Sequence, residues 1–455
     1  MSRKLTKVIS VILSVVLVFS FGVIASAEET APSYTIVNPY KDVIWEGEGA
    51  WTAYRGSLHT HSTYSDASET LKDMVMEYYN QGFGFLGMAD HSVTGVEWNK
   101  APNEFILYIY QTIIGYAKEH LTDAEYEGVI NGTYPMADGS TREYGMTCVT
   151  GANELNGVTL TKGHVVAYDL AYNVGTGHAG LENGHREAVE FAEKNGGYSV
   201  IAHPGDWIDT REGVNDPEYI DYFAKIFLDY DSCLGMEVFN ENNNAAPWDR
   251  NLWDNILMET LPYGRTVWGY ANSDAHVLRN VDSSFSVFMM PENTTDNIRE
   301  TMYNGNFFAV TRKVHEHPTL GPSETIDVID QQLPVPMATN VVVDGSTITM
   351  DVENAQYVQW IANGKVVAKT EVNGTGTSTI DLSAIEGSEE FLYVRAEIFG
   401  EGGCAASQPF VIEENVGTME YEKDTSFMAK LEYIWYRIIS LRIFVLFQEL
   451  YRAIV

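Results

Sequence analysis

The segment from Arg55 to Asp66, with the sequence RGSLHTHSTYSD, contains residue types that bind metal ions. His59 and His61 are two positions apart, and Asp66 follows five residues after the second histidine. Alternate residues of a strand point to the same face, so a strand over 56–61 would place both imidazoles side by side. Two neutral imidazoles supply half of a tetrahedral site, and a loop could bring Asp66 back to them. Such a pair also arises by chance, so the other ligands have to come from elsewhere in the chain.

Further polar residues stand at the ends of apolar, strand-like runs. Those that follow such a run are His91, Glu154, His203, Asp274 and His276, and His164 stands at the start of one. In parallel α/β folds the carboxyl ends of the strands form the active face. Six of the eleven histidines occupy these positions, counting His59 and His61. The pattern therefore predicts a single metal-binding face.

The elements that must position these residues alternate between strand and helix from 55 to about 312. Gly82 ends an expected helix over 69–81, and the apolar run 83–89 completes a parallel strand–helix–strand unit. The sustained alternation predicts an α/β barrel or a doubly wound sheet. Further strands are expected at 146–155, 163–170, 198–203, 234–239, 266–272, 285–290 and 307–311, and helices at 103–120, 185–195, 217–230, 252–261 and 294–304. The polar stretch 122–144 is expected to be a surface loop.

Seven pieces of the sequence resemble motifs of the PHP (polymerase and histidinol phosphatase) superfamily of metal-dependent phosphoesterases. They are LHTHSTYSD (58–66), ADHS (89–92), GANEL (151–155), GHVVAYDL (163–170), VIAHPGD (200–206), GMEVFN (235–240) and NSDAH (272–276), in the family's order. The resemblance covers about 55–312 and implies a distorted (β/α)7 TIM-like barrel in a PHP metallohydrolase domain at 55–320. The overall layout resembles the secreted bacterial branch of the family.

The resemblance also implies a site for two or three divalent metal ions (Mn, Zn or Fe). The first metal would take His59, His61, Glu154 and Asp274, the second would share Glu154 and add His164 and His203, and the third would take Asp66, His91 and His276. Many members have His where this chain has Asp66, and a carboxylate there favours Mn or Mg over Zn. Glu154, Asp274 and His276 are the expected catalytic residues.

This ligand set suits hydrolysis. Glu154 can bridge two metals, and a water shared by two metals has its pKa lowered enough to be hydroxide near neutral pH. Three divalent ions contribute a charge of +6, and Asp66, Glu154 and Asp274 return −3, so the pocket would be positive. Such a pocket suits in-line attack on a phosphate ester, because the metals neutralise the charge that builds up on its oxygens.

Several neighbours of the motifs are weaker candidates for the substrate site. Arg279 and Asn280 could contact phosphate oxygens, although a surface salt bridge explains Arg279 equally well. Trp207 is a further substrate-binding candidate, and together with Trp248 and the asparagines at 242–244 it could form the substrate wall. Ordinary loop packing accounts for these residues equally well.

Other polar residues near the motifs have structural explanations. Asp90 could orient a metal ligand or cap a helix. Glu237 could lie near the site, and a structural role is the first expectation for it. The remaining histidines are expected to face solvent: His120, His178, His185, His315 and His317.

The composition narrows the range of partners. The 455 residues carry a formal charge of −35, which repels polyanions such as duplex nucleic acid. A small anionic substrate could still bind where metals make one pocket positive. The three cysteines, Cys148, Cys233 and Cys404, do not form a disulfide scaffold or a CxxC metal pair. One disulfide is compatible with their number, and packing roles are favoured.

The flanking regions differ from the α/β part. Residues 1–27 have a basic start, an apolar run and an Ala25-Ser26-Ala27 site, and predict a cleaved export signal or, as the lesser alternative, an uncleaved anchor. A lead-in at 28–54 is expected to pack outside the main domain. Residues 325–413 predict an immunoglobulin-like β-sandwich that acts as a spacer or as a carbohydrate- or wall-binding module. The amphipathic helix at 427–455 either docks on the protein or lies at a membrane surface.

Together these features favour a secreted, metal-dependent phosphoesterase that hydrolyses a phosphomonoester or phosphodiester, such as a nucleotide or short oligonucleotide. One alternative keeps the metals and changes the bond to a carbamate, ester or amide. The other alternative is a non-catalytic binding protein associated with the wall or the membrane. A relict of that kind usually loses ligands, and none is missing in this chain.

Overall fold

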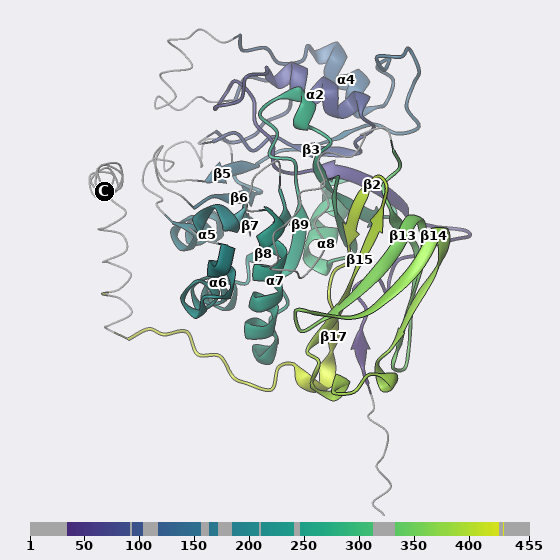
Figure 1. Ribbon diagram of the computed structural model, residues 1–455. Coiled ribbons are helices and arrows are strands. Elements are labelled where there is room, and N and C mark those ends of the chain that lie inside the picture. The colour runs from purple at the N-terminus through teal and green to yellow at the C-terminus, as the bar shows by residue number, and fades with distance from the viewer. Residues whose placement is uncertain are drawn as a thin grey trace, which may run out of the picture.

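The computed structural model describes residues 34–91, 93–102, 117–155, 163–171, 184–208, 211–240, 246–312, 333–426 and Leu431. The predicted export signal and, apart from Leu431, the predicted tail lie outside these residues. The described chain has a mixed α/β architecture with a five-stranded and a twelve-stranded sheet (Figure 1), which confirms the predicted class. Among the described helices, none is both long and apolar enough to cross a membrane.

The five-stranded sheet carries most of the predicted α/β alternation. In spatial order its strands are β5 (Asn153–Leu155), β6 (Val165–Tyr168), β7 (Tyr198–Ile201), β8 (Cys233–Phe239) and β9 (Trp268–Ala271). β7, β8 and β9 run parallel, whereas β6 is antiparallel to both neighbours, β5 and β7. Every residue of β8 is buried, as expected for a central strand that is covered on both faces.

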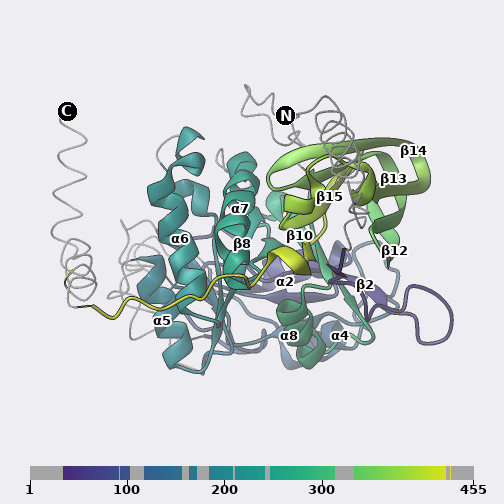
Figure 2. The ribbon, with the colours of Figure 1, turned by 90° about the horizontal axis from the view of Figure 1, so that it is seen from below.

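Three helices pack against this sheet and lie side by side in Figure 2. They are α5 (His185–Lys194), α6 (Pro217–Asp229) and α7 (Ala246–Thr260). Ala188, Phe223 and Leu252 from the three helices join Met236 of β8 in one buried apolar cluster. α6 begins where its sequence predicts. The Asp216 carboxylate caps the helix by accepting from the backbone N–H of Glu218 at 2.9 Å, and Pro217 occupies the first helical position.

The larger sheet joins the first strands of the chain to its last ones. Its order is β1, β17, β15, β16, β11, β10, β2, β3 and β4, and β13 pairs with β12, β14 and β15. The strands are β1 (Ile36–Val37), β2 (Thr52–Ser57), β3 (Phe85–Gly87), β4 (Thr147–Val149), β10 (Ser284–Met290), β11 (Phe307–Thr311), β12 (Met337–Asp344), β13 (Thr347–Ala362), β14 (Lys365–Asp381), β15 (Tyr393–Gly400), β16 (Gly403–Ala406) and β17 (Phe410–Ile412). β2 and β3 are parallel and are connected through α2 (Leu71–Asn80), which confirms the predicted strand–helix–strand unit. α8 (Thr295–Asn304) connects β10 to β11.

The two sheets meet at two isolated bridges. Thr60, beyond β2, pairs with Ala275, beyond β9, and His91, beyond β3, pairs with Glu154 of β5. With these bridges, β2, β3 and β5 to β9 form a ring of seven strands. Five of the neighbouring pairs are hydrogen-bonded strand pairs, and the other two, β3 with β5 and β9 with β2, are linked by the single bridges. Both bridges lie within the predicted metal-binding motifs, so the seam between the sheets coincides with the predicted site.

The outer edge of β9 is completed by side chains instead of a strand. The Gln408 amide accepts from the backbone N–H of Gly269 at 2.9 Å and donates to its carbonyl at 2.7 Å. The Ser286 hydroxyl does the same at Ala271, at 3.1 and 2.9 Å. These contacts satisfy buried backbone groups that a missing neighbour strand would otherwise leave unpaired.

The C-terminal strands are bonded directly to the α/β part. β16 pairs antiparallel with β11 of the α/β part, and β15 packs against α7 (Figure 1). Arg395 of β15 makes a two-pronged contact with Asp254 of α7 at 2.7 Å for each prong, and Glu397 receives both Arg395 and Arg250 at 2.8 Å. All four side chains are buried. The immunoglobulin-like assignment of 325–413 stays a prediction.

Some predicted boundaries were wrong. The strand expected at 56–61 is β2 and ends at Ser57, so the two histidines follow it. The loop expected at 122–144 contains α4 (Asp123–Ile130), which starts with a capping box from Thr122 and Glu125. The strand expected at 146–155 is two strands, β4 and β5, which the left-handed Gly151 (φ 78°) separates. α7 begins six residues before its expected start. All three cysteines are free, as favoured.

Candidate metal centre

The structure brings all nine predicted ligands into one cluster. Ligand atoms lie within 4.8 Å of one another in four overlapping groups: His59, Glu154 and His203; His59, His61 and Asp274; His61, Asp66 and His91; and His91, Glu154 and His164. His276 joins them, because its Nε2 lies 3.3 Å from Asp66 and its ring stacks on that of His61 with a centroid distance of 4.4 Å. The predicted convergence is therefore present in the fold, and the individual roles remain predictions.

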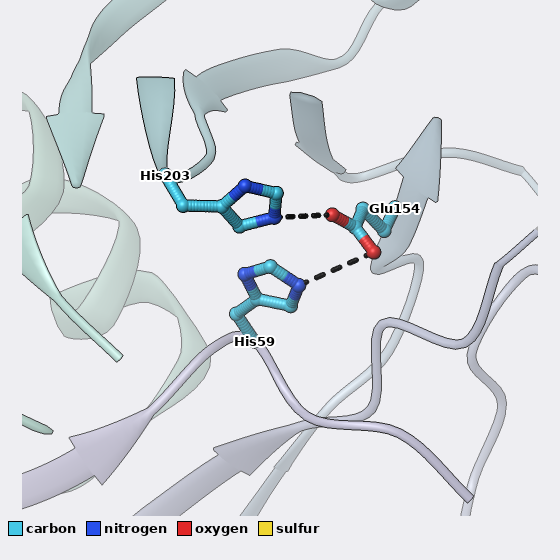
Figure 3. Close-up of side chains that lie close together, drawn as sticks. All are labelled: His59, Glu154 and His203. Carbon is cyan, nitrogen blue, oxygen red and sulfur yellow. Dashed lines mark hydrogen bonds and ion pairs between the residues drawn. The ribbon is translucent and has the colours of Figure 1, made fainter. Parts of the chain in front are cut away.

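Glu154 lies at the centre of the cluster. Its Oε1 is 2.9 Å from Nδ1 of His164 and 3.2 Å from Nε2 of His203. Its Oε2 is 3.3 Å from Nε2 of His59, 3.2 Å from that of His61 and 3.0 Å from Nδ1 of His91. Figure 3 shows the carboxylate beside the stacked His59 and His203 rings, with one oxygen toward each ring. A carboxylate with different imidazoles at each oxygen has the geometry of a bridging ligand.

The seam between the sheets aligns the first ligands. Beyond β2 the backbone N–H of His61 donates to the carbonyl of Ala275, and that of Asp274 donates to the carbonyl of His59, at 3.1 and 3.0 Å. This pairing puts Oδ1 of Asp274 3.3 Å from Nε2 of His59 and 3.0 Å from Nε2 of His61. The predicted same-face geometry thus holds, although both histidines lie after the strand.

The reversed direction of β6 explains how His164 reaches the centre. Because β6 is antiparallel to β7, its amino end lies beside the carboxyl end of β7. The backbone N–H of Ala202 donates to the His164 carbonyl at 3.0 Å, and Nδ1 of His164 is 3.3 Å from Nε2 of His203. A ligand at the start of a strand therefore belongs to the same face as ligands at the ends of others.

Two ligands have a left-handed backbone. φ is 25° at His203 and 44° at Asp274, a region that residues other than glycine rarely adopt. Strained residues of this kind gather at functional sites, where the surrounding structure holds them. At His203 the backbone N–H donates to Glu237 at 3.1 Å, and at Asp274 it is held in the pairing with His59.

The cluster is open on the side of Asp66. The side chains of Asp66 and His276 are 30% and 33% exposed, whereas those of His59 and His61 are fully buried. Asp66 lies 3.5 Å from Nε2 of His91 and 3.6 Å from Nδ1 of His61. A substrate from solvent would thus reach the predicted third-metal ligands first.

Asp90 supports the loop between His61 and Asp66. Its carboxylate accepts from the backbone N–H and the hydroxyl of Ser62 at 2.7 and 2.8 Å, and from the hydroxyl of Ser65 at 2.7 Å. The Ser65 hydroxyl in turn lies 3.2 Å from Nδ1 of His61. Of the two expected roles, orienting ligands is the one that these contacts support.

Glu237 was expected to be structural, and it lies directly behind the ligands. Its fully buried carboxylate receives four donors, from the ring of His59, the backbone of His203 and the amides of Asn240 and Asn272. The available signal was a single acidic residue in an otherwise apolar, buried strand, which must find partners or be costly.

Asp249 was missed by the sequence reasoning. It is buried in the first turn of α7. Its pKa is raised well above the usual range, mainly by burial and then by the negative charge of Asp206, and the charge of His203 and the backbone of Gly205 only partly offset this rise. Its carboxylate is thus coupled electrostatically to His203. No spacing signal marks it, because it reaches the site only through the packing of α7.

Charge coupling shapes the titration of the cluster. Burial alone would lower the pKa of His59, but Asp274, Glu154 and Glu237 outweigh it and raise this pKa to about 10. Burial likewise opposes the charged forms of Glu154 and Asp274, yet the surrounding histidines hold both pKa values well below normal. Burial dominates at His91 and lowers its pKa to about 4. Without metals, the cluster thus balances carboxylates with imidazolium groups.

The weaker candidates are only partly placed. Arg279 is exposed and Asn280 is buried on the short helix at Leu278–Asn280, which begins four positions after Asp274. Trp207 ends the 3₁₀ helix that starts just after His203, and Trp248 packs against the apolar cluster of α7. The asparagines at 242–244 lie outside the described residues. Substrate binding by any of them stays a prediction.

The remaining histidines show one error. His185 was expected to face solvent, but it is fully buried between α5 and α6, with its ring 5.0 Å from that of Phe223. Burial lowers its pKa well below the usual value. It starts a helix whose apolar face includes its own position, which the sequence reasoning overlooked. His120 is exposed as expected. His178, His315 and His317 lie outside the described residues.

Comparisons with known proteins find similarity only in structure. No protein-family model and no curated protein matches the chain. One similar structure is a two-domain protein of Bacteroides vulgatus ATCC 8482, described as containing a predicted PHP-like metal-dependent phosphoesterase. The match covers 84% of this chain and 100% of the Bacteroides chain, with 13% identity and a TM-score of 0.38. A lesion-specific endonuclease of Pyrococcus furiosus matches 63% of this chain over 62% of its own, with 13% identity and a TM-score of 0.33. Likeness at this level does not establish a shared activity, which has to be argued from the site.

Proposed function

We propose that this chain is a PHP-type metal-dependent hydrolase that cleaves a phosphomonoester or phosphodiester. The observation that carries the proposal is the convergence of six imidazoles and three carboxylates on one centre, with Glu154 between two sets of histidines. We further propose that the ring of seven strands is the distorted (β/α)7 barrel implied by the motifs.

The donor set fits two or three divalent ions. Imidazole nitrogens and carboxylate oxygens are ligands for Mn, Zn and Fe, and Nε2 atoms of His59 and His61 face each other at 3.2 Å beside Asp274. His59, His61 and Asp274 would hold one ion, His164 and His203 a second, and Glu154 would bridge them. When bound, such ions lower the pKa of water and neutralise charge on a phosphate.

The chain's own residues set the direction of approach. The buried pair His59 and His61 forms the floor, and the partly exposed Asp66 and His276 form the rim that a substrate meets. Nδ1 of His276 donates to the Asp274 carbonyl at 2.9 Å, so Nε2, which lies 3.3 Å from Asp66, is the nitrogen that can take up or release a proton on this rim. The formal charge of −35 disfavours binding of long polyanions, which supports a small anionic substrate.

The setting of the enzyme is part of the proposal. The export pattern at 1–27 supports an extracellular location, and the C-terminal strands or the tail would attach the enzyme to a cell wall or a membrane surface. Nucleotides or short oligonucleotides are the substrates that this setting and the phosphate chemistry favour.

A substrate panel tests the reaction class. Purified chain loaded with Mn²⁺ or Zn²⁺ is assayed with p-nitrophenyl phosphate, bis-p-nitrophenyl phosphate and an aryl carbamate. We expect turnover of at least one phosphate ester, and its loss in His59→Ala and Asp274→Ala, while His120→Ala, an exposed histidine outside the cluster, keeps full activity. A preference for the carbamate would overturn the phosphoesterase assignment, and turnover by His59→Ala would overturn the site.

A further inference from the structure

Glu237 connects three of the strands that carry the ligands. Its Oε1 lies 2.9 Å from Nδ1 of His59 and 2.9 Å from the Asn272 amide nitrogen, and its Oε2 lies 3.1 Å from the backbone nitrogen of His203 and 2.6 Å from the Asn240 amide nitrogen. The four donors come from the segment after β2, the end of β7, the end of β8 and the end of β9. One fully buried carboxylate therefore holds the ends of four strands together.

The contact with His59 fixes which ring nitrogen carries a hydrogen. A carboxylate accepts hydrogen bonds, so Nδ1 of His59 must donate, and in the neutral ring Nε2 then carries the free lone pair. Nε2 is the atom that faces Asp274 and Glu154, at 3.3 Å from each. Glu237 thus presents the correct nitrogen of His59 to a metal.

The contact with His203 holds a strained backbone. His203 has φ 25°, and its N–H donates to Glu237. The other oxygen of the same carboxylate accepts from His59, so the two histidines whose rings face the two oxygens of Glu154 (Figure 3) share one support.

We propose that Glu237 is a positioning residue that sets the tautomer of His59 and the placement of His203, and so controls metal affinity. This inference rests on the proposed metal centre. It extends that centre to a residue that contacts no ion, by the general rule that groups behind metal-ligating histidines tune the affinity of a site.

A glutamine cannot take over this role. If the amide nitrogen of the new glutamine replaces Oε1, this nitrogen faces Nδ1 of His59 and the amide nitrogen of Asn272. The Asn272 amide cannot turn around, because its oxygen accepts from the backbone N–H of Leu58 at 2.7 Å. His59 would then shift its hydrogen to Nε2 and lose the metal-binding lone pair. If the amide nitrogen replaces Oε2, it meets the backbone N–H of His203. Either orientation brings two donors together.

The test compares wild-type protein, Glu237→Gln and a matched control. The control is Glu397→Gln, which also removes a buried carboxylate that holds hydrogen bonds, but in β15. Affinity for Zn²⁺ is measured by competition with a chromogenic chelator, and metal content by mass spectrometry. We expect Glu237→Gln to lose about 10- to 100-fold in affinity, while Glu397→Gln loses thermal stability and keeps its metal affinity.

Nitrogen NMR of histidine-labelled protein provides a second readout. In zinc-loaded wild-type protein, His59 should carry its hydrogen on Nδ1. This measurement needs only the wild-type protein, so it tests the inference even if Glu237→Gln fails to fold. A wild-type His59 that binds zinc through Nδ1, or a Glu237→Gln protein with unchanged affinity and tautomer, overturns the inference alone. A wild-type chain that binds no metal overturns the proposed function together with it.

Discussion

At the scale of single residues, the cluster combines groups that cannot all be charged independently. Burial disfavours every charge in the cluster, yet its carboxylate oxygens and imidazole nitrogens lie within hydrogen-bonding distance, for example 3.0 Å between Asp274 and His61 and 2.9 Å between Glu154 and His164. The pKa values of His61 and His203 are therefore raised well above normal although burial opposes this, and that of Asp66 is lowered in the same way. Metal binding has to displace the protons on these histidines, so metal affinity should rise with pH.

This coupling predicts how the metal-free protein responds to alkali. The pKa of His59 in the folded protein is about 10, above its value of about 6.5 in the unfolded chain. Its contribution to stability is thus complete below about pH 6.5 and disappears as pH rises toward 10. We expect urea unfolding with a chelator present to show falling stability from pH 6.5 to 9.5, by at most about 1.4 kcal/mol per pH unit for each such group.

Zinc-loaded protein serves as the comparison for this experiment. Its histidines are already deprotonated by the metal, so the fall should be much smaller. A metal-free protein whose stability stays constant or increases over the same pH range would contradict the charge balance described above.

Sequence reasoning located the side chains that cluster at the centre well and the residues that support them poorly, while metal binding by the cluster stays a prediction. His59, Glu154 and Asp274 stand next to apolar runs, so their positions could be inferred before any coordinates. Glu237 and Asp249 matter because of what they contact, and contacts between β8, α7 and the ends of other strands leave no periodic mark in the sequence. His185 was misplaced for the same reason, since a polar residue can occupy the buried face of a helix.

At the scale of elements, α7 and β15 are joined by a network of buried ion pairs whose stability depends on every partner being present. Arg395 pairs with both Asp254 and Glu397, and Tyr393 donates to Asp254 at 2.6 Å. Breaking one partner of a buried network leaves the others charged and unpaired, which costs far more than breaking an exposed pair.

Arg395→Met tests this contact. It should lower the free energy of unfolding by about 3–5 kcal/mol, because the buried Asp254 loses its ion pair with Arg395 and keeps the Tyr393 hydroxyl, while Glu397 keeps Arg250. Urea unfolding followed by tryptophan fluorescence measures the change. Lys225→Ala, which removes an exposed pair with Asp221, is the matched control and should cost roughly 0–1 kcal/mol. Equal effects of the two substitutions would show that the buried network contributes little.

Strand and helix positions followed from the sequence more reliably than strand direction. Apolar runs and glycine stops located β3, β7, β8 and α6, because these elements are long or tightly bounded. The antiparallel course of β6 could not be read from its residues, since a short buried strand looks the same in either direction. The helix α4 was hidden because it is only eight residues long and lies in a stretch rich in Gly, Asp and Glu, where only its capping box marked it.

At the scale of the whole molecule, the C-terminal strands belong to the same hydrogen-bonded sheet as the α/β part. From β12 onward the described chain is rich in strands, as the change in composition indicated, but composition does not reveal which edges pair. β16 covers β11, and Gln408 completes the edge of β9. The two regions are therefore expected to fold together.

Truncation at residue 320 tests this dependence. We expect the shortened chain to be insoluble or unfolded, because it exposes the edge of β11 and leaves Arg250 and Asp254 without their buried partners. Solubility and circular dichroism measure the outcome. For the intact chain, calorimetry should show one cooperative transition, whereas a soluble, folded truncation or two separate transitions would show that the regions are independent.

The two single bridges at the seam have a consequence for the lifetime of the fold. Ligands on both sides of each bridge would let a bound ion cross-link the two sheets where backbone pairing is thinnest. Removing the ion should then speed deuterium uptake at the amides of His61 and Asp274, with the β13–β14 hairpin unaffected, as mass spectrometry of digested protein can measure. Equal uptake with and without chelator would contradict this. If it holds, scarcity of metal would not merely silence the protein but also open it to proteases, so that supply of the ion would determine how long each molecule persists.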